Sequence, residues 1–130
     1  MGTGLIGGTL LEQIAGQQKK LAEKDQIQIN LIGVAKYKWM IFNSEGLDPE
    51  KAKALINEES AQKKGKDGKV KKSETAQEPA DLKTFVEKMI ALNLPNACFC
   101  DCTASDDIAA MYGKILGSSI PVVTPNKRAN

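Results

Sequence analysis

Glycines near the start of the chain form the first group of residues whose spacing points to chemistry. The pattern G-x-G-x-x-G is matched by Gly2, Thr3, Gly4, Leu5, Ile6 and Gly7, which we call the fingerprint. In dinucleotide-binding proteins its glycines allow a tight turn, a close approach of the main chain to a pyrophosphate, and packing of the next helix on its sheet. That helix presents free N–H groups to the phosphates. Only Met1 precedes the fingerprint, where a strand is usual, and a glycine-rich loop without a nucleotide is the alternative.

A second group of residues follows the apolar segment 27–34 and distinguishes two related coenzymes. An acidic residue at the end of this strand would bind a ribose 2′-hydroxyl and select NAD. The chain has Ala35, Lys36, Tyr37 and Lys38 here, without an acid. Lysines favour a 2′-phosphate through charge-assisted hydrogen bonds. We therefore predict NADP, with NAD also possible, and favour Lys38 as the contact; solvated surface lysines are the alternative.

Two later loops carry polar residues that would meet the rest of such a coenzyme. Thr103 and Ser105 lie between a predicted strand and helix, so we predict that they touch the nicotinamide half. The alternative is a turn at Asp101 and a simple helix cap at Ser105. Thr124 and Lys127 follow the last predicted strand. A lysine desolvated in a cleft there would bind a carboxylate or move a proton, whereas most lysines are solvated.

The absence of histidine limits the chemistry of this chain. It excludes Ser–His and Cys–His nucleophile pairs and His-ligated zinc, so proton transfer must use Lys, Asp, Glu, Tyr or Cys. Cys98, Cys100 and Cys102 alternate along a predicted strand and share one face. Their spacing fits neither a C-x-x-C redox pair nor a four-ligand zinc site. We predict no metal site and interpret these cysteines as small buried apolar residues in a reducing cytoplasm.

The composition describes one domain of ordinary type. The chain has 130 residues, of which 42% are hydrophobic, so it has the length of one domain and can bury an aliphatic core. Its formal charge of +2 does not favour a nucleic-acid partner. It contains no apolar run long enough to span a membrane and no signal-peptide pattern. We expect a single cytoplasmic domain over 1–130 that binds neither nucleic acid nor membrane.

Hydrophobic periodicity predicts the elements that position these groups. The predicted helices are 6–21, 49–58, 82–90 and 105–117, and the predicted strands are 27–34, 97–100 and 120–123. The apolar segment 37–42 fits either a strand or a helix. The stretch 61–79 is rich in lysine and nearly free of apolar residues, which predicts a flexible surface loop, with a phosphate-rich partner as the alternative.

The order of these elements predicts the fold class. Strands alternating with helices indicate an α/β protein with an open parallel sheet and helices on both faces. This is a Rossmann-type, doubly wound fold of three layers, in which ligands bind at the carboxyl ends of the strands. The fingerprint, Ala35–Lys38, Asp101–Ser105 and Thr124–Lys127 are predicted at four such ends. We therefore expect these four loops to converge on one edge of the sheet.

Three blocks of the chain together resemble homoserine dehydrogenase. They are Gly2–Leu11, Asp101–Ser105 and Val122–Asn130, the last of which reads V-V-T-P-N-K-R-A-N and is the most specific. The resemblance covers nearly the whole chain apart from the lysine-rich insert. The segments Leu10–Gln13 and Gly33–Ala35 are especially similar to the dehydrogenase half of bifunctional aspartokinase–homoserine dehydrogenases.

The resemblance implies a module that binds NAD(P) in an enzyme interconverting aspartate 4-semialdehyde and homoserine, on the route to threonine and methionine. It implies that the fingerprint holds the pyrophosphate, that Lys38 meets the 2′-phosphate and that Thr103 contacts the cofactor near the nicotinamide. Lys127 is implied at the junction of cofactor and substrate, with a role in catalysis. The alternatives are a non-catalytic nucleotide-binding regulatory module and another NAD(P)-dependent dehydrogenase.

Two departures from the family pattern accompany this resemblance. The first strand of the family's fold would precede Gly2, and the catalytic and dimerisation region would follow Asn130. We therefore expect a cofactor-binding fragment that is truncated at the first strand, inactive alone, and part of a homo-oligomer when full length. Loss of a central strand exposes main-chain groups and apolar surface on its neighbours, which predicts low stability or self-association.

Overall fold

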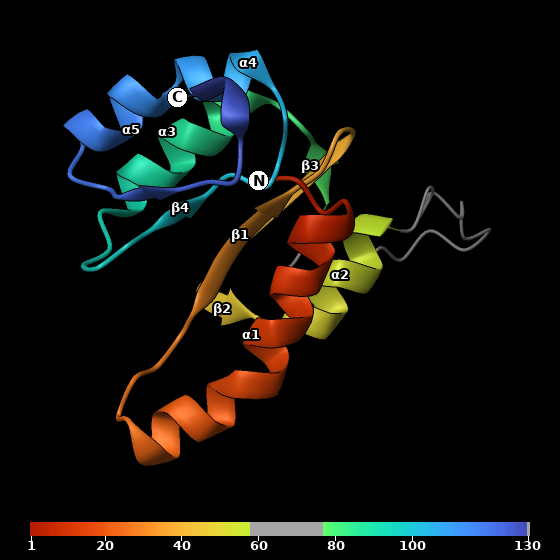
Figure 1. The fold of residues 1–130 in the computed structure, drawn as a ribbon, viewed down its shortest axis with the longest axis vertical. Coiled ribbons are helices and arrows are strands. Elements are labelled where there is room, and N and C mark those ends of the chain that lie inside the picture. Colours follow the sequence, from red (N-terminus) through yellow and green to blue (C-terminus); the bar gives the residue numbers. More distant parts are fainter. Residues whose placement is uncertain (58–76, 130) are drawn as a thin grey trace, which may run out of the picture.

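The computed structural model describes residues 1–57 and 77–129, which form two small sheets with helices around them (Figure 1). In chain order the elements are α1 (Leu5–Lys24), β1 (Leu31–Ala35), β2 (Trp39–Leu47), α2 (Pro49–Asn57), β3 (Glu78–Pro79), α3 (Leu82–Leu92), β4 (Phe99–Cys100), α4 (Asp106–Ala110), α5 (Tyr112–Gly117), β5 (Val122–Val123) and the 3-10 helix η1 (Lys127–Ala129). All the predicted helices and strands therefore have a counterpart, with shifted boundaries.

Strands β1 and β2 form an antiparallel hairpin, and β3 pairs antiparallel with β2. The ambiguous segment 37–42 is thus mostly strand. The turn Lys36–Lys38 is closed by a hydrogen bond of 2.9 Å from Lys36 N to Trp39 O. Three residues cannot carry the long crossover that parallel strands need, so this pair is antiparallel. This sheet therefore differs from the wholly parallel sheet that the order of elements predicts.

Parallel pairing is found between β4 and β5, where Phe99 is opposite Val122 and Cys100 is opposite Val123. The crossover between them contains two short helices, α4 and α5, in place of the single predicted helix over 105–117. Met111 separates the two helices. The two strands end together, so the loops that follow them, at Asp101 and Thr124, are neighbours.

Helices cover both faces of the β1–β2 hairpin. Val34 and Ile41 face one side and pack in a buried cluster with Leu11 of α1 and residues of α2. Ala35 and Met40, their neighbours along the chain, pack in a second cluster with residues of α3, β4 and α5. Because successive side chains of a strand point to opposite faces, the hairpin contributes to both cores.

The main chain of Met1 and Gly2 joins the two sheets at their carboxyl ends. Gly2 N donates to Ala35 O over 2.8 Å, and Cys102 N donates to Met1 O over 2.8 Å. The amino group of Met1 also donates to Cys100 O. These bonds place the fingerprint between the end of β1 and the end of β4.

The cysteines are more exposed than their interpretation as small buried apolar residues predicts. Cys98 is exposed, and Cys100 and Cys102 are half-buried. Phe99 and Asp101, which alternate with them, are the residues buried in the core. The prediction that the cysteines share a face agrees with this alternation, but that face points away from the main core.

Part of the predicted lysine-rich loop over 61–79 lies outside the described residues. Of this range only Gln77, Glu78 and Pro79 are described, and Glu78 and Pro79 form β3. Within the described ranges, no helix combines the length and apolar character needed to cross a membrane.

Candidate functional site

Gly2 occupies a position that leaves no space for a side chain. Its φ of +82° is in the left-handed region, and an added Cβ would lie 2.6 Å from Thr103 Cγ2 and 3.1 Å from Cys102 O. The same residue is hydrogen-bonded to Ala35 O, as described above. The first glycine of the fingerprint therefore brings the loops after β1 and β4 into contact.

Gly7 and Gly4 differ in the space around them. A Cβ on Gly7 would lie 1.7 Å from Gly2 O, so the first turn of α1 packs directly on the fingerprint loop. Gly4 precedes α1 as its N-cap, and a Cβ there would have no atom within 4 Å. No described side chain caps this end of the helix. Its N–H groups and positive dipole end are therefore available to an anion that approaches at Gly4.

Thr3 has unused hydrogen-bonding capacity inside the fingerprint. It is 6% exposed, and its hydroxyl is buried without a partner among the described residues. A buried hydroxyl without a partner costs free energy, so such groups in proteins are usually satisfied by water or a ligand. The residues at the N-terminus of α1 thus fit a phosphorylated ligand in both charge and hydrogen bonding.

Asp101, directly after β4, is the centre of a hydrogen-bond network. Its Oδ1 accepts bonds from Thr103 N at 2.9 Å and Thr103 Oγ1 at 2.6 Å. Its Oδ2 accepts bonds from Tyr112 Oη at 2.6 Å and Asn126 Nδ2 at 3.3 Å. Burial alone would raise the pKa of this carboxyl, but the hydrogen bonds from Thr103, Tyr112 and Asn126 outweigh it and hold the pKa below its ordinary value. Burial and the bond to Asp101 raise the pKa of the Tyr112 phenol.

The network also connects the loops after β4 and β5. Thr124 Oγ1 donates to Asp101 O at 3.0 Å and accepts a bond from Asn126 N at 2.9 Å. Asn126 is 2% exposed and donates from Nδ2 to Ser105 O at 3.0 Å. Ser105 is the N-cap of α4 by position, although its side chain makes no capping bond. The hydroxyl of Thr124 therefore joins Asp101 to the loop that carries Asn126.

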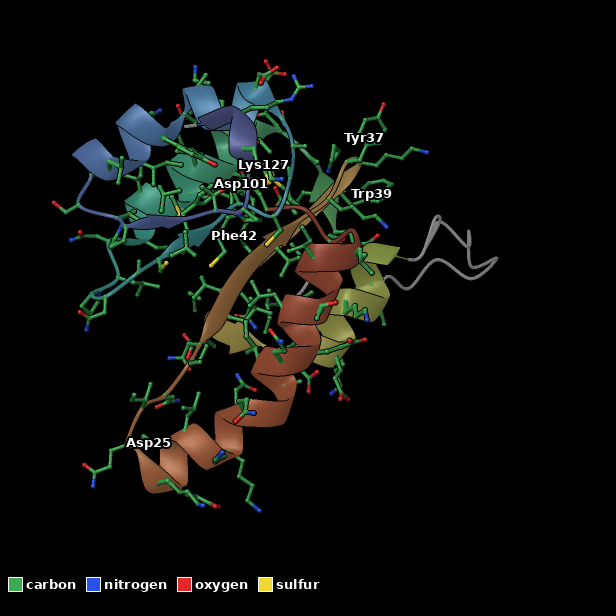
Figure 2. All side chains as sticks on the ribbon, in the orientation of Figure 1. Asp25, Tyr37, Trp39, Phe42, Asp101 and Lys127 are labelled. Carbon is green, nitrogen blue, oxygen red and sulfur yellow. The ribbon has the colours of Figure 1, made fainter. Side chains whose placement is uncertain are left out.

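Lys127 follows this anchored loop and is exposed in η1. Its neighbour Arg128 forms an ion pair of 2.7 Å with Asp106 of α4. Figure 2 shows Lys127 and Asp101 toward the same end of the molecule as Tyr37, far from Asp25 at the other end. The loop that carries Lys127 is thus held at the carboxyl ends of β4 and β5.

The tip of the β1–β2 hairpin carries Lys36 and Lys38. Ala35, the last residue of β1 before this turn, is buried and bonded to the fingerprint through Gly2, as described above. The main chain of Lys38 is held by a bond of 2.9 Å from Ala80 N to Lys38 O, and its side chain is exposed. Tyr37 between the two lysines is 90% exposed. The predicted 2′-phosphate contacts thus lie in a turn that directly follows Ala35, the residue of β1 that is bonded to the fingerprint.

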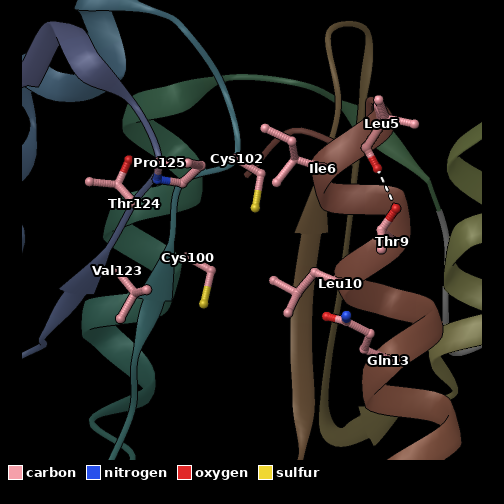
Figure 3. Close-up of a pocket in the computed structure, with 10 residues that line it drawn as sticks. All are labelled: Leu5, Ile6, Thr9, Leu10, Gln13, Cys100, Cys102, Val123, Thr124 and Pro125. Carbon is pink, nitrogen blue, oxygen red and sulfur yellow. Dashed lines mark hydrogen bonds between the residues drawn. The ribbon is translucent and has the colours of Figure 1, made fainter.

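A largely apolar pocket of about 550 Å³ lies between α1 and the β4–β5 pair (Figure 3). It is lined by Leu5, Ile6, Thr9, Leu10, Gln13, Cys100, Cys102, Val123, Thr124 and Pro125. The predicted site residues Leu5, Ile6 and Thr124 are therefore at its wall. Burial raises the pKa of the Cys102 thiol, which opposes formation of a thiolate nucleophile there.

The structure brings most of the predicted residues to one region and adds two. The fingerprint, Ala35, Thr103, Ser105 and Thr124 are linked by contacts and hydrogen bonds. Lys38 and Lys127 are exposed around them, and Lys36 is half-buried. Tyr112 and Asn126 are not among the residues that the sequence predicts for the site. The one sequence signal for Asn126 is its place in the T-P-N-K block, and the position of Tyr112 within the predicted helix 105–117 gives no signal of a site residue. Across the described ranges, no group of three or more acidic or cysteine side chains gathers to hold a metal ion.

Comparison with known proteins places this chain in a family. The model of the homoserine dehydrogenase NAD-binding domain matches residues 2–130. The whole chain is 36% identical to bifunctional aspartokinase/homoserine dehydrogenase 1, chloroplastic, of Arabidopsis thaliana, and spans 12% of that protein. It is 29% identical over its whole length to the bifunctional aspartokinase/homoserine dehydrogenase of Haemophilus influenzae, of which it spans 14%. No solved structure matches the chain significantly. The chain therefore belongs to the homoserine dehydrogenase NAD-binding domain family.

Proposed function

We propose that this chain is the coenzyme-binding domain of a homoserine dehydrogenase, which interconverts aspartate 4-semialdehyde and homoserine in threonine and methionine biosynthesis. The observation that carries the proposal is the contact of the fingerprint with the ends of both β1 and β4, through Ala35 and Thr103. The family match over 2–130 supports it. The chain spans about an eighth of the length of these relatives. The substrate that the family implies is a small molecule, and we infer that other regions of the full-length protein help to bind it.

The described residues fit the parts of a nicotinamide dinucleotide in order. The N-terminus of α1, from Gly4 to Gly7, would hold the pyrophosphate, and Lys38 the adenine ribose 2′-phosphate. Thr103, Ser105 and Thr124 would surround the nicotinamide half, with Lys127 beside the substrate. When bound, the coenzyme supplies or accepts the hydride, and these residues orient it. Thr3, with its unpartnered hydroxyl, is a further contact at the phosphate position.

We infer that both sheets belong to one doubly wound, three-layer Rossmann-type unit that includes all of 1–130. The main-chain bonds of Met1 and Gly2 to both sheets support this inference. The helices on both faces of the hairpin support it as well. The flexible loop over 61–79 stays a prediction for the residues outside the described ranges, whereas Glu78 and Pro79 form β3.

We infer NADP as the preferred coenzyme, with weaker use of NAD, because Ala35–Lys38 offers positive charge and no acid. The test is calorimetric titration of the chain with NADPH and NADH. Lys38→Ala is expected to weaken NADPH binding about tenfold or more and to leave NADH binding unchanged. Lys24→Ala, at the far end of α1, makes the same change of charge and should alter neither affinity. Tighter binding of NADH by the unmodified chain would contradict the inference.

We infer that Lys127 is catalytic in the full-length enzyme. General acid–base groups typically contribute a factor of about 10² or more, so Lys127→Ala should lower kcat by about that factor. NADPH affinity should change little, because the phosphates are held at α1. Arg128→Lys, at the adjacent position, serves as the control and should keep its activity. Unchanged turnover in Lys127→Ala would instead favour a non-catalytic regulatory module.

We infer a cytoplasmic homo-oligomer for the full-length protein. The three cysteines of the chain are free, which suits a reducing compartment. The Arabidopsis relative is chloroplastic by name, so the compartment differs among relatives. Size-exclusion chromatography of the full-length protein tests the oligomeric state, and a monomer would contradict it.

A further inference from the structure

The Thr103 hydroxyl has a restricted hydrogen-bonding capacity. Its Oγ1 lies 2.6 Å from Asp101 Oδ1 and 3.2 Å from Ser105 N. A hydroxyl has one proton to donate and two lone pairs that accept. Because Ser105 N–H can only donate, it uses one lone pair. One lone pair and the proton then remain to be assigned.

The proton of this hydroxyl must lie between Thr103 and Asp101. Asp101 is fully buried, and N–H and O–H donors approach both of its carboxyl oxygens. These donors stabilise the ionised carboxylate, which has no proton to give. Two oxygens 2.6 Å apart without a proton between them would repel each other, so Thr103 is the donor. The hydroxyl then retains a single lone pair for any further partner.

We propose that Asp101 is a positioning residue that makes the Thr103 hydroxyl an acceptor toward the cofactor, so that the group it recognises is a hydrogen-bond donor. On a nicotinamide ring that donor is the NH₂ of the carboxamide, because the carbonyl oxygen only accepts. The inference rests on the proposed function and adds which partner donates the hydrogen bond in this contact. Tyr112 and Asn126 donate to Oδ2 of Asp101, which leaves Oδ1 to the bonds with Thr103.

The test compares two ligands that differ only in this donor. The 130-residue chain is titrated with NADP and with its 3-acetylpyridine analogue, in which a methyl group replaces the amide NH₂ and the oxygen is kept. One hydrogen bond corresponds to an affinity about three- to tenfold higher for NADP. Thr103→Ser should keep this preference, whereas Thr103→Val should bind both ligands with nearly equal affinity.

A second comparison, between two further variants, tests the role of Asp101. Asp101→Ala frees the Thr103 hydroxyl to rotate and donate to the ligand oxygen, so the preference for NADP should fall toward that of Thr103→Val. Tyr112→Phe keeps the Thr103–Asp101 bond and should keep the preference. In the unmodified chain, NMR should show a Thr103 hydroxyl proton protected from solvent exchange. This measurement and the two-ligand comparison need no variant, so they decide the matter even where a variant fails to fold.

The outcomes separate this inference from the proposed function. Equal affinities of the unmodified chain for the two ligands, or an unchanged preference in Thr103→Val, would overturn the inference while NADP binding stands. A rapidly exchanging Thr103 hydroxyl proton would also overturn it. Failure of the unmodified chain to bind NADP at all would overturn the proposed function and this inference together.

Discussion

At the residue scale, the side chain of the site with the most hydrogen-bond partners is a buried carboxylate. Asp101 is fully buried and accepts hydrogen bonds from Thr103, Tyr112 and Asn126. These residues come from the loop after β4, from α5 and from the loop after β5. One carboxylate therefore fixes the relative position of the loops that carry Thr103 and Lys127.

The lowered pKa of Asp101 makes its contribution to stability dependent on pH. The contribution is fully present above the ordinary value of 3.8 and is lost as the pH falls through the lower pKa of the folded state. Tyr112→Phe removes a donor to the charged carboxylate, so the free energy of unfolding at pH 7 should fall by about 1.5–3 kcal/mol. The acid-unfolding midpoint should move to higher pH. Urea unfolding across a pH series measures both quantities.

Tyr37→Phe is the matched control for this substitution, because Tyr37 is 90% exposed at the hairpin tip. It should leave the free energy of unfolding and the acid midpoint unchanged within about 0.5 kcal/mol. Equal behaviour of the two variants would show that the Tyr112–Asp101 bond contributes nothing to the folded state.

At the scale of elements, α1 meets the site through backbone contact. Gly7 is in the first turn of this helix, where an added Cβ would lie 1.7 Å from Gly2 O. Gly16 is in the same helix, and a Cβ there would have no atom within 4 Å. The packing of α1 therefore requires a glycine at position 7 but not at position 16, although both glycines lower the intrinsic stability of a helix.

Substitution of these two glycines should separate the docking of α1 from its helical propensity. Gly7→Ala should lower the free energy of unfolding by about 1–3 kcal/mol, because backbone atoms must move to relieve the overlap. It should also weaken NADPH binding. Gly16→Ala should raise the free energy of unfolding by about 0.5–1 kcal/mol and leave binding unchanged. Denaturant unfolding and calorimetry test both, and a stable, binding-competent Gly7→Ala would contradict the close packing.

The pairing of the strands could not be predicted from the sequence. Apolar alternation located β1, but the segment 37–42 fitted a strand or a helix equally well. The pairing of β2 with β1 depends on a three-residue turn closed by Lys36 N and Trp39 O. Periodicity describes one strand at a time, and pairing direction is a relation between two.

At the scale of the whole molecule, Phe85 of α3 connects the two sheets. Its ring centroid lies 4.5 Å from that of Phe42 in β2 and 6.3 Å from that of Phe99 in β4. Phe85 is 4% exposed. The ring of Phe85 therefore packs against one ring from each sheet inside the core cluster that they share.

Truncation of this ring should destabilise the whole fold. Phe85→Ala is expected to lower the free energy of unfolding by about 3–5 kcal/mol, through lost burial and the cavity left behind. Leu116→Ala, at a position that is 55% exposed, should change it by less than about 0.5 kcal/mol. Thermal unfolding followed by circular dichroism compares the two. Similar losses in both variants would mean that Phe85 does not join the two sheets.

The sequence by itself determined the fingerprint geometry, the helices and the family, because these depend on residue type and short-range spacing. The positive φ of Gly2 and the lack of room for a Cβ on Gly7 beside Gly2 O both arise within the fingerprint itself. Tertiary structure alone decided the two sheets, the antiparallel hairpin and the partners of Asp101. Tyr112 and Asn126 reach that carboxylate only because β4 and β5 pair in parallel and end side by side. Contacts between residues distant in the chain depend on packing, which no local pattern encodes.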